Sequence, residues 1–327
     1  MNRVFVLVTG LYLLVSAGDG HAQWYQDTQA IMGTRVHVEF YRPDGNDGPQ
    51  LLSQVMEEMR RIDAKFSSYK DTSELSRLNR AAINGWVEVS DELFDLLSKA
   101  HQVSVLTAGA FDVTYASVGR YYDYRQAKAP DAELIAKAVQ GINYEYVERD
   151  RQRQAVRYSR PEVYVALGGI AKGYAVDRGI AILQRAGVAH ASVSAGGDSR
   201  IIGDRLGQPW SVGIQHPRAD DKMSAVLPLV DTAVSTSGDY ERYFEEDGVR
   251  YHHILDPSTG RSATGAWSVT VLGPDATFTD ALSTSVFVLG PERGLALINR
   301  LPGIDAIIID PAGQLLFSAD LMELSPE

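Results

Sequence analysis

One stretch in the middle of the chain, Val163–Asp177, constrains the fold most, because it predicts a strand, a sharp turn and a helix in succession. Apolar residues alternate from residue 163 to 167, which is typical of a strand. The pair Gly168-Gly169 interrupts this pattern. Apolar residues at helical spacing then begin at Ile170, and Gly187 stands near the expected end of the helix.

A helix that begins directly after a strand and a glycine turn presents free backbone N–H groups at the positive end of its dipole. Lys172 adds a positive charge in the first turn, where the dipole disfavours one. The junction therefore predicts a phosphate-binding site, with a solvated lysine as the alternative. The spacing G-x-x-x-x-G-K-[ST] of nucleotide-binding loops does not occur here.

Charge and composition exclude several classes of function. The chain has 327 residues, a net charge of −11 and no basic run, so nucleic acid is not expected as a partner. It contains no cysteine, which excludes disulfides, thiolate metal sites and cysteine nucleophiles. We find no internal repeat or linker and expect one domain over residues 23–327.

Residues 1–22 are predicted to be a signal peptide. Arg3 precedes an apolar run from Val4 to Val15, and small residues follow. Cleavage is expected after Ala22, with Ala17 as the alternative, and an uncleaved anchor remains a second interpretation. The lack of cysteine excludes a lipid anchor. We therefore expect a soluble periplasmic protein with no stable membrane span after cleavage.

The remaining pattern predicts a mixed α/β fold. Amphipathic helices are expected over residues 49–66, from Ser73, over 90–106 with Gly109 closing the helix, from Thr279, and over 291–301. Strands are expected at 36–40, 191–195, 210–215, 267–272 and 304–309. Residues 234–242, rich in small hydroxyl side chains, predict a tight loop near a ligand.

Several polar residues stand where chemistry is plausible. Asp112 follows a helix end and is interpreted as a loop cap or a ligand contact. His253 is the best candidate base in the chain, with an ordinary titration near pH 6–7, while a structural role is the alternative. His252 is expected to point to the opposite face of the strand and to be replaceable.

Asp280 and Thr284 are four residues apart, so they share one face of a helix. A carboxylate and a hydroxyl are hard-oxygen ligands suited to Mg²⁺. The alternative is an aspartate that interacts with the helix dipole. Met32, in a small turn before a strand, is interpreted from its residue type as core packing.

Eight motifs in this order resemble the ApbE family of FAD:protein FMN transferases, over nearly all of the chain after the signal peptide. The motifs are Met32–Thr34, Phe66–Tyr69, Ser73–Asn79, Gly109–Thr114, Leu167–Asp177, Ser235–Asp239, His253–Pro257 and Asp280–Thr284. The resemblance implies a two-lobed α/β (α+β) protein with a T-fold-like core and FAD in the cleft between the lobes.

The resemblance also implies the roles of particular residues. Those expected to contact FAD are Met32, Tyr69, Ala110, Phe111, Asp112, Ala166, Lys172 and Leu255. The carbonyl of Gly169 is expected to join Asp280 and Thr284 around Mg²⁺, and His253 and Asp280 are the implied catalytic residues. Position 166 is commonly acidic or an amide in the family, so Ala166 puts one FAD contact in doubt.

The implied activity is Mg²⁺-dependent transfer of FMN from FAD to a Ser or Thr hydroxyl of an acceptor flavoprotein, such as a subunit of a membrane-bound redox complex, with release of AMP. Two alternatives stay open at this point. One is a Mg²⁺-dependent FAD pyrophosphatase, which the ring of Tyr69 would oppose by limiting access of water. The other is a flavin-binding carrier without turnover, against which His253, Asp280 and Thr284 argue.

Overall fold

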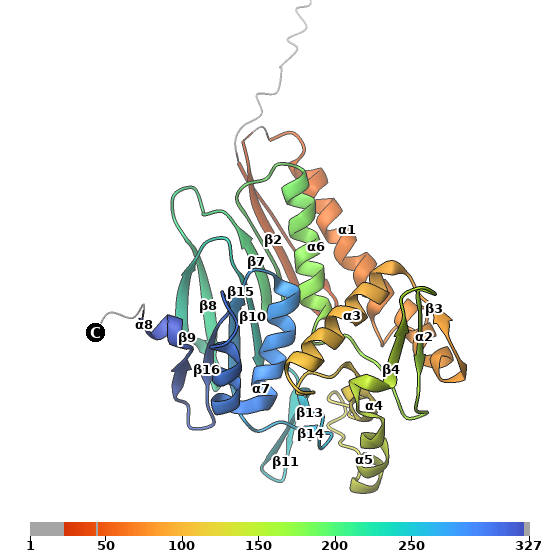
Figure 1. The fold of residues 1–327 in the computed structure, drawn as a ribbon. Helices are drawn as coiled ribbons and strands as arrows, with labels where there is room; N and C mark the ends of the chain where they lie inside the picture. Colours follow the sequence, from red (N-terminus) through yellow and green to blue (C-terminus); the bar gives the residue numbers. More distant parts are fainter. Residues whose placement is uncertain (1–22, 44, 324–327) are drawn as a thin grey trace, which may run out of the picture.

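An eight-stranded, wholly antiparallel sheet forms the centre of the molecule (Figure 1). The computed structural model describes residues 23–43 and 45–323, so the predicted signal peptide lies outside the described residues. In spatial order the strands are β1 (Gln23–Ile31), β2 (Thr34–Arg42), β6 (Ala191–Ala195), β7 (Asp198–Ile202), β10 (Ala233–Gly238), β15 (Ser268–Gly273), β16 (Asp305–Ile309) and β17 (Leu315–Phe317).

Three long helices cover one face of this sheet: α1 (Gly48–Phe66), α6 (Ala171–Arg185) and α7 (Ala276–Ile298) (Figure 1). The apolar positions of α1, spaced three and four apart, are buried as the sequence predicted, except Leu52, which is partly buried and packs against the same core. Inward-facing residues of β2 alternate with half-buried ones and complete the same core. Burial of each large apolar side chain stabilises the fold by about 1.5–3 kcal/mol.

A smaller group of elements packs beside the helices. It contains α2 (Glu74–Ala81), α3 (Asp91–Leu106), α4 (Ala116–Gly119), α5 (Ala132–Ala138) and a three-stranded sheet of β3 (Val87–Glu88), β5 (Ala155–Tyr158) and β4 (Val147–Asp150). Ser73 and Ser90 cap α2 and α3 by accepting hydrogen bonds from backbone N–H groups three residues on, at 2.9 and 3.3 Å. The predicted starts of both helices are therefore confirmed.

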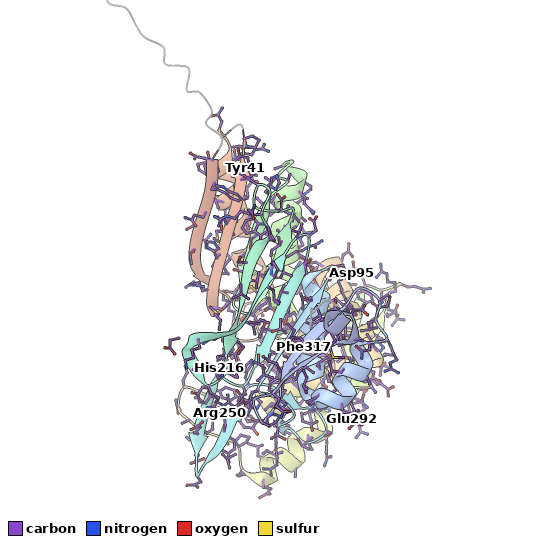
Figure 2. All side chains as sticks on the ribbon, turned by 90° about the vertical axis from the view of Figure 1, so that its left-hand side faces the viewer. Tyr41, Asp95, His216, Arg250, Glu292 and Phe317 are labelled. Carbon is purple, nitrogen blue, oxygen red and sulfur yellow. The ribbon has the colours of Figure 1, made fainter. Side chains whose placement is uncertain are left out.

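Short ribbons and turns complete the mixed α/β fold. The ribbons are β8 (Trp210–His216) with β9 (Ala219–Leu229), β11 (Tyr243–Glu246) with β12 (Val249–His252), and β13 (Leu255–Asp256) with β14 (Arg261–Ser262). The single-turn helices are η1 (Ala82–Asn84), η2 (Val113–Tyr115), η3 (Val139–Gly141) and η4 (Tyr144–Tyr146), and α8 (Ala319–Glu323) ends the described chain. Figure 2 shows Tyr41 near the upper end of β2, with His216 and Arg250 low in the molecule.

The strand predicted at residues 163–167 is wrong: the segment has no regular secondary structure and joins no ladder. Side chains take the place of a neighbouring strand. Asn79 accepts from the N–H of Val165 and donates to its carbonyl, both at 2.9 Å, while Ser117 Oγ accepts from Tyr164 N at 3.0 Å. Alternation of apolar residues reports alternating burial, and here the partner that satisfies the backbone is a side-chain amide.

Residues 234–238 differ from their prediction too. They form a strand in the middle of the sheet, β10, and the turn begins only after Gly238. Small hydroxyl residues fit this strand because α7 packs closely on it, with Ser235 Oγ and Thr279 Oγ1 in hydrogen-bond contact at 2.8 Å.

Helix α7 begins one turn earlier than predicted, at Ala276, with Asp275 as its N-cap. Gly290, at a φ of 74°, interrupts it before Pro291, so the two predicted helices are adjoining segments of one element. Among the described residues α7 alone is long and apolar enough to cross a membrane. Its buried residues pack on β10 and β15, as in the core helix of a globular protein.

Candidate functional site

The predicted site residues gather where the start of α6 meets the start of α7. Gly173 makes this meeting possible, because a Cβ there would lie only 2.0 Å from the carbonyl oxygen of Ala276. The close approach brings Gly173 N within 2.9 Å of Asp280 Oδ2, to which it donates. The anion expected at the N-terminus of α6 is thus, in this structure, a carboxylate of the protein itself.

A single lysine lies between two buried carboxylates at this junction. Lys172 Nζ contacts Asp198 Oδ2 and lies 3.4 Å from Asp280 Oδ1. The side chains of Asp198 and Asp280 are 2% and 3% exposed, against 29% for Lys172. Burial, with Asp198 as the next cause, raises the pKa of Asp280 to about 7, while the two carboxylates outweigh burial and raise the pKa of Lys172 above its ordinary value.

Lys172 is therefore a partly exposed cation paired with carboxylates of the protein, and its predicted contact with a phosphate of FAD remains a prediction. Asp198 was not singled out from the sequence. It directly follows the turn Gly196-Gly197, and paired glycines also precede Lys172. This similarity is the only local sequence pattern that points to Asp198.

The three predicted metal ligands lie close together. A Cβ on Gly169 would be 3.3 Å from Thr284 Oγ1, and Asp280 stands one turn before Thr284 on α7. Ser237 Oγ, on β10, lies 3.3 Å from Thr284 Oγ1 and 2.8 Å from Ser283 Oγ. These hydroxyl, carbonyl and carboxylate oxygens form a donor set that suits a hard cation such as Mg²⁺.

Within the described residues, no group of three or more His, Asp or Glu side chains could hold a metal ion. The predicted set contains one carboxylate, so it fits only a cation that keeps waters or substrate oxygens as its other ligands. Mg²⁺ behaves in this way, whereas Zn²⁺ prefers nitrogen and sulfur.

The adjacent histidines have different surroundings. His253 donates its backbone N–H to Arg242 O at 3.1 Å, and its buried Nδ1 has no hydrogen-bond partner among the described residues. Burial, then the neighbouring His252, Arg242 and Lys172, lower the pKa of His253 to about 3. This pKa lies below the titration near pH 6–7 expected from the sequence, because burial and nearby positive charge both disfavour an imidazolium.

His252 is a structural residue. It is 4% exposed, its Nε2 bonds to the Ala263 carbonyl at 2.8 Å, and its ring lies edge-on to Phe287 with centroids 5.5 Å apart. Burial lowers its pKa also. That the two side chains point to opposite faces of one strand remains a prediction, because β12 ends at His252. Since the His252 ring is buried and hydrogen-bonded, we expect its substitution to destabilise the fold, unlike the replaceable residue that the sequence predicts.

Met32 lies at the tip of the β1–β2 hairpin, in a two-residue turn. Met32 and Gly33 have φ angles of 56° and 69°, a conformation that a long side chain seldom adopts. The Met32 side chain packs partly on the core, as its residue type predicted. A Cβ on Gly33 would lie 3.1 Å from Arg242 Nη2, so the hairpin tip adjoins the segment that holds His253.

The loop from Ala110 to Tyr115 borders the glycine turn. A Cβ on Gly169 would approach the ring of Phe111 to 3.2 Å, and the backbone of Ala110 bonds to Thr107 O at 3.2 Å. Asp112 accepts from Thr114 N and Oγ1 at 2.8 and 2.6 Å, which confirms the loop-cap interpretation. Burial raises the pKa of Asp112 to about 6.

Three further residues predicted to contact FAD are Ala166, Tyr69 and Leu255. Ala166 is buried beside this loop and donates its N–H to Val113 O at 2.9 Å. Tyr69 lies on the loop after α1 with its side chain 87% exposed. Leu255 is buried in a small separate cluster with Val118 and Tyr122, so its side chain serves packing in this structure.

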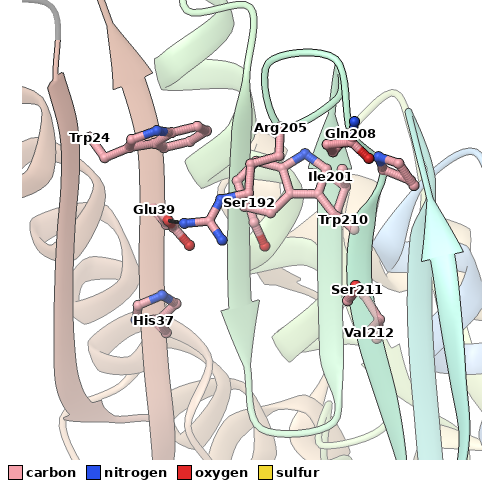
Figure 3. A pocket seen from close by; sticks show the side chains of 11 residues that line it. Trp24, His37, Glu39, Ser192, Ile201, Arg205, Gln208, Trp210, Ser211 and Val212 are labelled. Carbon is pink, nitrogen blue, oxygen red and sulfur yellow. Dashed lines mark hydrogen bonds and ion pairs between the residues drawn. The ribbon is translucent and has the colours of Figure 1, made fainter.

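One hollow, of about 650 Å³, lies away from these residues on the face of the sheet next to the β8–β9 ribbon (Figure 3). Arg205 lies there near the rings of Trp24 and Trp210, at 5.0 and 5.6 Å from their centroids, and pairs with Glu39 at 2.6 Å. None of the predicted site residues lines it. Its aromatic and charged contacts tie the ribbon to β1 and β2.

Three comparisons show which known proteins this chain resembles. The ApbE family model matches residues 32–308. A protein of Vibrio cholerae named FAD:protein FMN transferase is 32% identical over 312 residues, which cover 92% of each chain. One of Treponema pallidum with the same name is 31% identical over 342 residues, covering 98% of this chain and 94% of the relative.

Solved structures show the same fold. The crystal structure of the ApbE protein from Thermotoga maritima superimposes with a TM-score of 0.85 and 38% identity, covering 93% of this chain and all of that one. The flavin transferase ApbE from Vibrio cholerae gives a TM-score of 0.83 and 29% identity, over 92% of this chain and 99% of that one.

Proposed function

Because this chain belongs to the ApbE family and is an FAD:protein FMN transferase, we propose that it moves FMN from FAD to a Ser or Thr hydroxyl of an acceptor flavoprotein, with Mg²⁺, and releases AMP. The observation that supports this most is the meeting of Gly169, Asp280 and Thr284 beside Lys172 at the α6–α7 junction. Oxygen donors and one ammonium group suit a pyrophosphate and its cation.

Gly169, Asp280 and Thr284 would hold the Mg²⁺, through a carbonyl, a carboxylate and a hydroxyl. When bound, the ion would neutralise the pyrophosphate charge and polarise the bond that breaks. The protein's own contribution is to fix these oxygens: α7 is capped by Asp275 and Asp177, which accept from backbone N–H groups of its first turn at 2.8–3.0 Å.

His253 would take the proton of the acceptor hydroxyl. In support of this role, its Nδ1 has no hydrogen-bond partner among the described residues, and its low pKa keeps the ring neutral at working pH. The acceptor oxygen then bonds to the FMN phosphorus and AMP leaves. Lys172 and Arg242 contribute to the low pKa of His253. The negative pyrophosphate of bound FAD would offset these charges and raise the basicity of His253 when it is needed.

Hydrolysis of FAD by the same site is the second candidate function. Tyr69, the side chain expected to limit access of water, is 87% exposed and so shields little in this conformation. Without an acceptor, water could then take the place of the protein hydroxyl.

The test is to incubate the protein with FAD, Mg²⁺ and a purified acceptor flavoprotein, and to measure intact masses and free nucleotides. A gain of one FMN by the acceptor with one AMP released supports transfer. Free FMN and AMP without a mass gain support hydrolysis instead. An acceptor variant with Ala at the modified hydroxyl residue is the control.

Export is a separate part of the proposal. The pattern of Arg3, the apolar run and Ala22 supports a cleaved signal peptide and a periplasmic enzyme, acting on an acceptor such as a subunit of a membrane redox complex. N-terminal sequencing of the protein from its native host should begin at Gln23. A soluble cytoplasmic protein that retains Met1 would contradict this.

A further inference from the structure

We propose that Asp198 is a positioning residue: it holds the ammonium group of Lys172 so that Asp280 can bind a divalent cation. This inference rests on the proposed role of Asp280 as a metal ligand. It assigns a function to a carboxylate that lies outside the set Gly169, Asp280 and Thr284.

Asp198 is fixed in place by the sheet. It begins β7, where it pairs with Ala195 of β6 on one side and with Ser235 of β10 on the other. It is 1% exposed. A carboxylate anchored between two strands cannot follow a ligand, so its charge stays beside the start of α6.

Lys172 is the movable member of the cluster. Its ammonium ends a four-carbon side chain on the first turn of α6, 29% exposed, and contacts Asp198 more closely than Asp280, from which it is 3.4 Å away. Its positive charge offsets the repulsion between the two buried carboxylates. Two such charges with no cation between them would be strongly disfavoured.

A divalent cation at Asp280 would compete with Lys172 for the Asp280 carboxylate. An ammonium beside Asp280 repels the divalent cation and competes with it for the same carboxylate oxygen. When Asp198 holds the ammonium, both the repulsion and the competition are weaker. Asp198 therefore keeps the lysine near the site, ready for a phosphate, without blocking the metal. If Asp198 were neutral, Asp280 would be the only carboxylate that Lys172 contacts within the described residues.

The experiment measures Mg²⁺ binding alone, by calorimetry on the whole protein without FAD, for the wild type, Asp198→Asn, Lys172→Met and the double variant. Asp198→Asn should weaken Mg²⁺ binding about 10–100-fold, the range of a hydrogen bond to a charged group. Lys172→Met should tighten it. In the Lys172→Met background the loss caused by Asp198→Asn should be at least about fivefold smaller, since the two residues act together.

Equal losses in both backgrounds would overturn the proposal, because Asp198 would then act by its charge alone. Complete loss in both would overturn it too, because Asp198 would itself be a metal ligand. If Asp198→Asn does not fold, Lys172→Met still decides: failure to tighten Mg²⁺ binding contradicts the proposal.

Two controls complete the test. Asp95→Asn removes a carboxylate that is 61% exposed on α3 and pairs with Arg151, and it should leave Mg²⁺ binding unchanged. Asp280→Asn separates the two proposals: if it binds Mg²⁺ as the wild type does, the metal assignment fails, whatever Asp198 does.

Discussion

Two charged clusters lie along α6, and they are built in opposite ways. At its start, Lys172 serves two carboxylates, Asp198 and Asp280, that are nearly inaccessible to solvent. On its outer side, facing α1 and α3, Glu58 and Glu92 are shared among three cations. Those cations are Arg61, Lys65 and Arg178, which are 23–41% exposed.

The pKa values follow this difference in opposite directions. Burial, then Asp198, raises the pKa of Asp280 to about 7, whereas hydrogen bonding from Arg61, against the effect of burial, lowers the pKa of Glu92 to about 2. A cluster in which each carboxylate has a cationic partner and the cations are partly open to water stabilises ionised acids and needs no ligand. A buried cluster with more carboxylates than cations is suited to receive another cation.

The outer cluster borders a groove of about 840 Å³, larger than the hollow under Arg205. Its charged residues form ion pairs, including Asp177 with Arg200 at 2.7 Å and Lys99 with Asp275 at 2.8 Å. The volume of a groove therefore does not identify the proposed active site. The ratio of carboxylates to cations and the burial of the carboxylates distinguish it.

The largest effect is expected at the buried cluster. Asp280→Ala should lower Mg²⁺-dependent FMN transfer by roughly 10³-fold or more, because the only carboxylate of the proposed metal site is lost. FAD should still bind, since its rings are expected to contact other residues. Steady-state transfer at saturating FAD checks this, with Glu92→Gln in the outer cluster as the matched variant. Equal activity losses in both variants would remove the distinction between the clusters.

Next, His253→Asn should lower transfer by about 10²–10⁴-fold, the usual contribution of a positioned base. Because the pKa of His253 is about 3 in the free protein, kcat/KM should fall by a similar factor across the neutral pH range. His252→Asn should instead lower the melting temperature, since it disturbs a buried hydrogen-bonded ring. A selective loss of transfer in His252→Asn with a normal His253→Asn would reassign the base.

A packing change should affect the buried cluster without removing a charge. Gly173→Ala places a Cβ 2.0 Å from the Ala276 carbonyl oxygen and forces α6 away from α7. Unfolding free energy should fall by about 1–3 kcal/mol, the usual range for overpacking, and transfer should decline with it. Urea denaturation measures the change in unfolding free energy. Gly207→Ala, where a Cβ meets nothing within 4 Å but φ is 93°, is the comparison variant, because it adds backbone strain without overpacking.

The smallest effect is expected in the outer cluster. The folded pKa of Glu92, about 2, lies below its ordinary 4.5, so its ionised form stabilises the fold above that value and the gain is lost as pH falls from 4.5 toward 2. Glu92→Gln should cost about 1 kcal/mol at neutral pH, a value that allows for solvent screening. In urea titrations, the difference in unfolding free energy between this variant and the wild type should shrink at about pH 3. A constant difference would contradict this account.

Much of the fold follows from local patterns in the sequence. The apolar spacing of α1, the serine caps of α2 and α3 and the alternation in β2 each depend on residues a few positions apart, so the sequence alone determines them. The motifs that carry the family resemblance likewise predict Asp280, Thr284 and Gly169 as metal ligands, and these residues lie close together in the structure.

Only the tertiary structure decided the relations between distant segments. Asn79 replaces a strand partner for Val165. Asp198, on a strand, and Asp280, on α7, both meet Lys172 of α6, and Gly173 lets α6 touch α7. Periodicity reports which face of an element is buried, but not what it is buried against. The charge balance that distinguishes the site, and the low pKa of His253, arise from contacts between elements far apart in the chain, and no local pattern encodes them.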